Sequence, residues 1–167
     1  MGDRDTLLTD RSSLVARHTS GVTRHAARLF VAGVNGAVAL AVVAFWTAWH
    51  FAPEAVQSVP PGAPGREAYL AHEEAFPLAD GWMAACALLG ALGLVHRRPW
   101  GAYLCLLANG AMLFLALLDL LFALQRGAFW PPGAETAQTW LIVAGLVFAA
   151  TVSAATIYRR RLAGPAS

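Results

Sequence analysis

Residues 100–124 read WGAYLCLLANGAMLFLALLDLLFAL, and Asp119 is the only acidic or basic side chain among them. This stretch exceeds the roughly 20 apolar residues that an α-helix needs to cross the hydrocarbon core of a bilayer. Polar and small residues recur along it at spacings of four, three, four and three, which places them on one helical face: Cys105, Asn109, Met112, Ala116 and Asp119. We expect that face to point into the protein and the leucine-rich remainder to meet lipid.

Three similar stretches lie on either side of this one. Residues 29–52, 78–95 and 137–158 are apolar over most of their length, and proline, glycine or arginine residues mark their ends. The whole chain is 57% hydrophobic and 13% charged, whereas a soluble domain has about 25% charged residues. The sequence therefore predicts an all-α integral membrane protein, with residues 29–158 forming one four-transmembrane-helix antiparallel bundle.

The arginine residues predict the orientation, because basic residues beside a span resist translocation. The chain has no lysine, and two arginines, Arg66 and Arg126, fall on one predicted side. The other ten fall on the opposite side: Arg4, Arg11, Arg17, Arg24, Arg28, Arg97, Arg98, Arg159, Arg160 and Arg161. We expect both termini to be cytoplasmic. Exclusive use of arginine together with much alanine is typical of a GC-rich genome, so we expect the plasma (inner) membrane of a bacterium.

Two connecting segments are expected to form short helices at the membrane interface. The basic leader, residues 1–28, has leucine and valine pairs a heptad apart, which favours an amphipathic helix that breaks near Ser20 and Gly21, although a frayed tail fits equally well. The first outer loop is turned by the proline-rich residues 59–65, and a brief helix is expected after it. Residues 159–167 form a basic cytoplasmic tail.

Small residues at helical spacing predict close helix packing in a bilayer. They occur on three of the expected spans: Gly33, Ala37 and Ala41; Ala84, Ala87 and Ala91; Gly145, Ala149 and Ser153. These faces fit either contacts within the chain or contacts with a second copy or a larger membrane partner. Membrane lipids are expected to surround the protein. Nucleic-acid binding is not expected, because the arginines form no continuous basic face.

Several polar and aromatic residues are expected at similar depth in the outer leaflet. Counting at ~1.5 Å per residue from the cytoplasmic arginines places Asp80, Asp119 and His50 within one layer. We predict an outward-facing ligand- or proton-binding pocket around Asp119, which would suit a cationic amphiphile or a proton-linked carrier. Its expected members are Asp119, Asp80, His50, Asn109, Trp46, Trp49 and Trp82. Each also has a structural explanation: an interfacial belt for the tryptophans, headgroup-level polarity at a helix end for His50 and Asp80, and a hydrogen bond between helices for Asn109 and Asp119.

Other functions have less support in the residues. A haem or metal site between His50, His72 and Glu73 is conceivable, but no two histidines stand at the i, i+4 spacing that would make it specific. The two cysteines, Cys86 and Cys105, form no C-x-x-C pair. Hydrolase and nucleotide-binding motifs are missing, so the sequence favours a binding or carrier protein, or a non-catalytic accessory subunit of a larger membrane complex, over an enzyme. No cofactor is indicated.

Overall fold

The chain is all-helical in a computed structural model, which describes the backbone of residues 3–130 and 132–160 and the side chains of residues 22–130 and 132–160. Along the chain the elements are α1 (Asp3–Phe51), η1 (Pro53–Ala55), α2 (Arg66–Glu73), α3 (Pro77–Val95), α4 (Pro99–Arg126) and α5 (Ala134–Arg160). Four helical segments are long and apolar enough to cross a membrane: Val22–Phe51, Arg66–Val95, Pro99–Arg126 and Ala134–Arg160. The expected all-helical chain with four such segments is thus confirmed, and it indicates a multi-pass membrane protein.

Proline and glycine residues set the ends of the helices. Pro77 and Pro99 stand in the first turns of α3 and α4, where a missing N–H removes no helical hydrogen bond. At the other end of α4, Gly127 adopts a left-handed conformation with φ of 67°, which glycine tolerates without a steric cost. The short helix expected in the first loop is α2.

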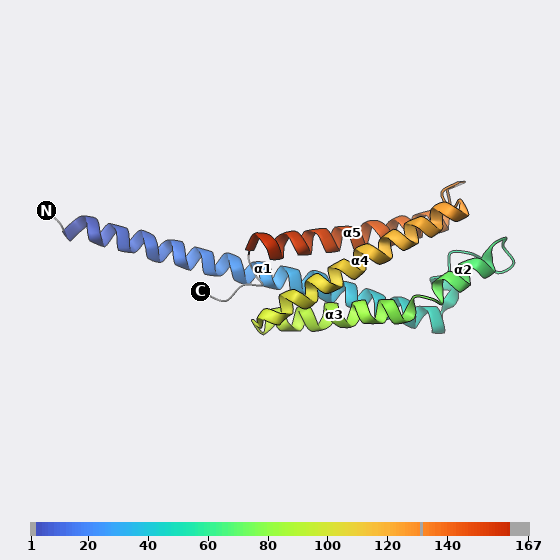
Figure 1. Cartoon of the computed structure of the whole chain (residues 1–167), viewed down its shortest axis with the longest axis horizontal. Helices are drawn as coiled ribbons and strands as arrows, with labels where there is room; N and C mark the ends of the chain where they lie inside the picture. The colour runs from blue at the N-terminus through green and yellow to red at the C-terminus, as the bar shows by residue number, and fades with distance from the viewer. Residues whose placement is uncertain (1–2, 131, 161–167) are drawn as a thin grey trace.

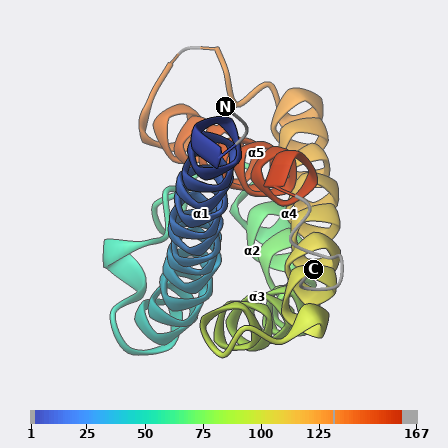
Figure 2. The ribbon, with the colours of Figure 1, turned by 90° about the vertical axis from the view of Figure 1, so that its left-hand side faces the viewer.

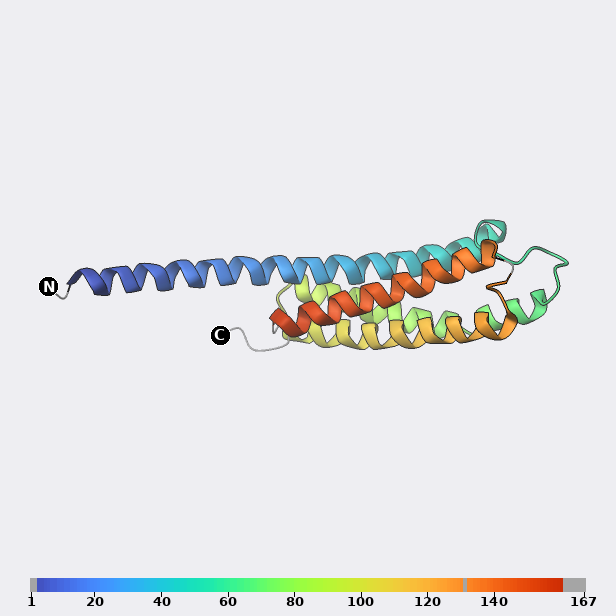
Figure 3. The ribbon, with the colours of Figure 1, turned by 90° about the horizontal axis from the view of Figure 1, so that it is seen from above.

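The N-terminal leader differs from its expected form, because α1 continues without a break from Asp3 to Phe51. A glycine inside a helix costs only about 1 kcal/mol relative to alanine, and serine costs less, so Ser20 and Gly21 do not interrupt it. Figures 1 and 3 show the leader extending beyond the ends of the other long helices. The leader side chains that were expected to form an apolar face lie outside the described residues. The tail after Arg160 also lies outside them.

The four long helices form a ring of neighbours. Helix α1 packs against α3 and α5, α3 packs against α4, and α4 packs against α5, as the view along the helices shows (Figure 2). The α3–α4 seam is the closest. A Cβ added to Gly101 would lie 2.5 Å from the backbone nitrogen of Leu94, and one added to Gly90 would lie 2.7 Å from that of Cys105.

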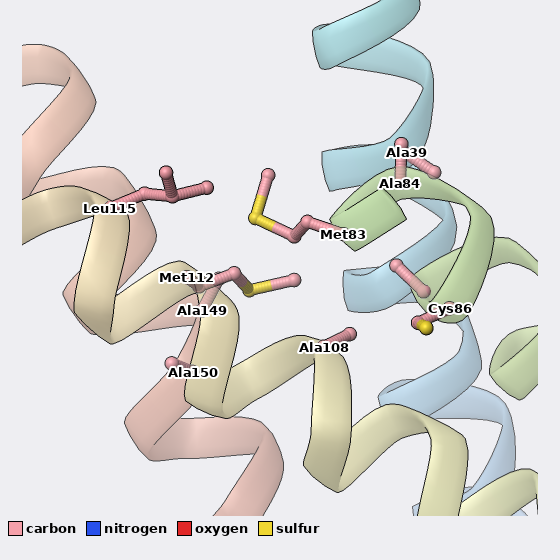
Figure 4. Close-up of a cluster of buried hydrophobic side chains, with 10 residues drawn as sticks. Ala39, Met83, Ala84, Cys86, Ala108, Met112, Leu115, Ala149 and Ala150 are labelled. Carbon is pink, nitrogen blue, oxygen red and sulfur yellow. The ribbon is translucent and has the colours of Figure 1, made fainter. Parts of the chain in front are cut away.

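The buried core is made mostly of small side chains. Met83, Met112 and Leu115 are its largest apolar members, and alanines from α1, α3, α4 and α5 surround them (Figure 4). On α4, the four inner members of the predicted stripe, Cys105, Asn109, Met112 and Ala116, are buried as expected. On α1 the small residues Gly33, Ala37 and Ala41 are exposed instead. The buried face of α1 is formed by other residues: Val31, Ala32, Asn35 and Ala39.

Candidate functional site

A cavity of about 460 Å³ lies among the helices and takes part of its wall from each of α1 to α5. Most of its lining is apolar, with Phe45, Phe76 and Met83 as the larger side chains. Among the described side chains, the acidic or basic residues of its lining are Glu73, Asp80 and Asp119. The volume falls within the range of about 300–1,000 Å³ that is usual for small-molecule sites. We call this space the carboxylate cavity.

Asp80 is held at the wall by a tryptophan from the neighbouring helix. It lies in the first turn of α3, and its Oδ2 accepts a hydrogen bond of 2.9 Å from the indole Nε1 of Trp46 on α1. The Trp46 ring is fixed in turn by Phe45, at 5.3 Å between ring centroids, and by Trp49, at 5.8 Å. A carboxylate at this depth needs such a donor, because burying it alone is costly.

Asp119 is approached by a histidine from α2. Its Oδ1 lies 3.5 Å from Nε2 of His72. The imidazole is stacked on the Phe122 ring, with 3.6 Å between centroids and 9° between planes, and it meets the edge of Phe76 at 4.7 Å. The two aromatic rings fix the imidazole plane, so the histidine nitrogen is directed at Asp119 by packing.

Glu73 brings a third carboxylate into the same space. It lines the carboxylate cavity together with Asp80 and Asp119. Like charges that share a cavity of low dielectric constant repel one another strongly. A bound cation or a shared proton would relieve that repulsion.

A second, smaller cavity of about 30 Å³ adjoins the first and shares Glu73 and Asp119 with it. Ser58, Tyr69 and Gln138 contribute polar groups to its lining. This volume is enough for a water molecule. The carboxylate cavity therefore adjoins a polar compartment that can hold water.

An ion pair lies beside this compartment. Arg126 Nη2 is 3.5 Å from Oε1 of Glu135, and the guanidinium stands 5.4 Å from the centre of the Phe122 ring and 5.7 Å from that of Tyr69. The pair joins the last turn of α4 to the first turn of α5. It confines the polar compartment at this end of the helices.

The structure brings together only part of the predicted pocket. Asp80 and Asp119 line the carboxylate cavity. Trp46 does not line this cavity but donates a hydrogen bond to Asp80. His50 and Trp46 instead line a separate groove of about 590 Å³ between α1 and α3, where Nδ1 of His50 lies 2.8 Å from the Trp46 carbonyl oxygen.

The other predicted aromatic residues lie outside the carboxylate cavity. Trp49 packs on Tyr69, with 6.1 Å between ring centroids. Trp82 is 61% exposed. These two side chains fit the interfacial explanation given for tryptophan.

Asn109 belongs to a different polar cluster. Its Nδ2 donates to Ser153 Oγ at 3.1 Å, and Nδ2 of Asn35 donates to the same oxygen at 2.9 Å. All three side chains are buried. They join α1, α4 and α5 by hydrogen bonds, as expected of polar residues between membrane helices.

Sequence reasoning missed Glu73 as a member of the pocket. Glu73, Phe76 and Asp80 stand at spacings of three and four, which would have placed them on one face if the helical pattern had been continued through Pro77. All three line the cavity.

The two histidines proposed as metal ligands do not lie together: His50 lines the groove and His72 lines the small cavity. Among the described side chains, no group of three or more His, Cys, Asp or Glu residues is placed to hold a metal.

The chain matches no protein-family model, no curated protein and no solved structure.

Proposed function

We propose that this protein binds a cationic amphiphile in the carboxylate cavity and acts as a binding or carrier protein of the membrane. The observation that carries the proposal is a largely apolar cavity of about 460 Å³ whose lining, within the described part of the chain, is charged at Glu73, Asp80 and Asp119 alone. The carboxylates complement an ammonium group, and the apolar walls complement a hydrocarbon or aromatic body.

The proposed setting is a bacterial plasma membrane, with the four spans as an antiparallel bundle and both termini in the cytoplasm. The distribution of the arginines supports this orientation, because ten of twelve lie on the side assigned to the cytoplasm. In this orientation Asp80 and Asp119 lie in the outer leaflet. The cavity then belongs to the outer half of the protein.

Binding is expected to depend on pH, because protons compete with a cation for the same carboxylates. Protonation removes the negative charge that attracts the ligand, so affinity falls as the medium becomes more acidic. Asp119 is the residue on which we expect this competition to depend most, since His72 approaches it and Glu73 lines both cavities with it. Exchange of a ligand for protons at one site is the basis of a proton-linked carrier.

The test is saturable binding of tritiated dodecyltrimethylammonium to the purified full chain in lipid nanodiscs at several pH values. Asp119→Asn is expected to lower affinity about tenfold or more, the loss of one charge-assisted contact, and to weaken the pH dependence while the protein stays folded, since Glu73 and Asp80 remain. Glu74→Gln is the matched control, because Glu74 is exposed beside Glu73 and does not line the cavity. Unchanged binding by Asp119→Asn would contradict the proposal.

An accessory role in a larger membrane complex is the second candidate, and one observation favours it. Gly33, Ala37 and Ala41 leave an exposed strip of small residues on α1, which would let another helix approach closely. An accessory subunit would not bind the amphiphile alone and would be isolated with a partner of fixed stoichiometry. Purification in a mild detergent followed by mass measurement separates the two functions.

A further inference from the structure

We infer that the amphiphile reaches the carboxylate cavity sideways from the bilayer, through a window between α1 and α5, with its tail left in the lipid. This inference rests on the proposed function and specifies its ligand: an amine already dissolved in the membrane. Three observations carry it: the groove at the α1–α3 seam holds none of the carboxylates, two hydrogen bonds bound the α1–α5 seam, and the residues between these bonds are exposed.

Small buried residues pack at the α3–α4 and α4–α5 seams, whereas the α1–α3 seam carries the groove of about 590 Å³ described above. Helices α3 and α4 approach so closely that a Cβ on Gly93 would lie 2.6 Å from the Cα of Gly101. Ala39 of α1 and Ala84 of α3 belong to one buried cluster, as do the α4 and α5 alanines. The α1–α3 groove is lined by none of the three carboxylates Glu73, Asp80 and Asp119.

The α1–α5 seam is closed at two levels. On the cytoplasmic side of the cavity, Asn35 of α1 donates to Ser153 of α5 at 2.9 Å, and Val31 and Ile157 are buried in one cluster. On the outer side, Nε2 of Gln138 in α5 donates to the carbonyl oxygen of Val56, just after α1, at 3.1 Å.

The seam between these two levels is lined by small or exposed residues. Ala37 and Ala41 of α1 and Gly145 of α5 line the carboxylate cavity and are exposed to the outside as well. A Cβ on Gly145 would meet nothing within 4 Å. Leu141, also in the lining, is 76% exposed. The same residues thus face both the cavity and the surroundings of the helices, which are lipid in the proposed setting.

The carboxylates stand on the elements opposite the window. Glu73, Asp80 and Asp119 belong to α2, α3 and α4, whereas the window lies between α1 and α5. An ammonium group passing through the window therefore approaches the carboxylates head first. The tail remains between α1 and α5, so ligand length is not limited by the volume of the cavity.

The experiment compares a blocked window with a matched surface change. Gly145→Leu adds a side chain at the window, and Gly110→Leu adds the same side chain at an exposed position of α4 where a Cβ also meets nothing within 4 Å. Each full-length variant in nanodiscs is mixed with the fluorescent amphiphile trimethylammonium diphenylhexatriene. Saturable energy transfer from tryptophan then gives the association rate, the dissociation rate and the Kd.

We expect Gly145→Leu to slow association about tenfold and to weaken Kd, because the leucine narrows the route and also occupies space beside the tail of the bound amphiphile. Gly110→Leu should match the wild type. Unchanged rates in Gly145→Leu, or a weaker Kd with an unchanged association rate, would overturn the window and leave the proposed function standing. Absence of saturable binding by the wild type would overturn both. A covalent dimer formed by Ala41→Cys under oxidation would assign this seam to a second copy and also overturn the window.

Discussion

The indole nitrogen of Trp46 and the carboxylate of Asp80 are joined by a hydrogen bond of 2.9 Å that links α1 to α3. The bond engages one oxygen of Asp80 and holds the side chain at the wall of the carboxylate cavity. Because Trp46 is part of an aromatic cluster with Phe45 and Trp49, the donor is itself held in place. The position of one cavity carboxylate is therefore set by packing on a different helix.

Replacing this donor should weaken the protein measurably. Trp46→Phe keeps an aromatic ring but leaves Asp80 without its indole partner, so we expect the free energy of unfolding to fall by about 1 kcal/mol. Unfolding by denaturant in bicelles measures it. Trp82→Phe is the control, because Trp82 is 61% exposed. Equal stability of the two variants would show that the Trp46–Asp80 bond contributes nothing.

Ser153 should contribute more to the stability of the protein than the small size of its side chain suggests. It accepts hydrogen bonds from both Asn35 and Asn109 in the buried cluster, so Ser153→Ala deprives two buried amides of their common partner. We expect a loss of about 1–2 kcal/mol in the free energy of unfolding. Thr151→Ala, at an exposed hydroxyl that bonds within its own helix, should change stability little. A similar loss in both variants would contradict the role given to the cluster.

Gly101 should tolerate no side chain. Its added Cβ would lie 2.5 Å from the nitrogen of Leu94 and 2.6 Å from the carbonyl carbon of Gly93, and backbone atoms move only with the helix. Gly101→Ala is expected to lose about 3 kcal/mol of stability, as for severe overpacking. Gly110→Ala, which has open space, should be neutral or slightly stabilising. Thermal unfolding in detergent compares the two.

The proposed orientation predicts which loops face outward. Ala55→Cys, at the end of η1, should react with a membrane-impermeant maleimide in intact cells, whereas Arg98→Cys, between α3 and α4, should react only after the membrane is opened. Cys86 and Cys105 are buried, so the background should be low. Labelling of Arg98→Cys from outside would reverse the topology.

The sequence alone predicts the features that depend on hydrophobic composition and on helical periodicity. Apolar length gave the four helices, and the spacing from Cys105 to Ala116 gave the buried face of α4. Depth counted from the arginines placed Asp80 and Asp119 in one layer, and both line the same cavity. These inferences succeed because each concerns one helix and its axial rise.

The other features depend on how each helix is rotated about its own axis and on which helices are in contact. The periodicity of a single helix does not determine either of these. Trp82 has the right depth but is exposed, and His50 lies at the outer groove. Gly33 and Ala37 are exposed where a packing face was expected. Glu73 ends α2, before α3 begins at Pro77, so the period of the span that carries Asp80 does not include it.

Native mass spectrometry of the full chain released from nanodiscs with dodecyltrimethylammonium tests the central claim most directly. The carboxylate cavity predicts one bound cation per chain for the wild type and for Glu74→Gln, and none for the double variant Asp80→Asn, Asp119→Asn. Equal retention of the cation by the double variant, or a wild-type chain that carries a partner subunit and no cation, would contradict the account.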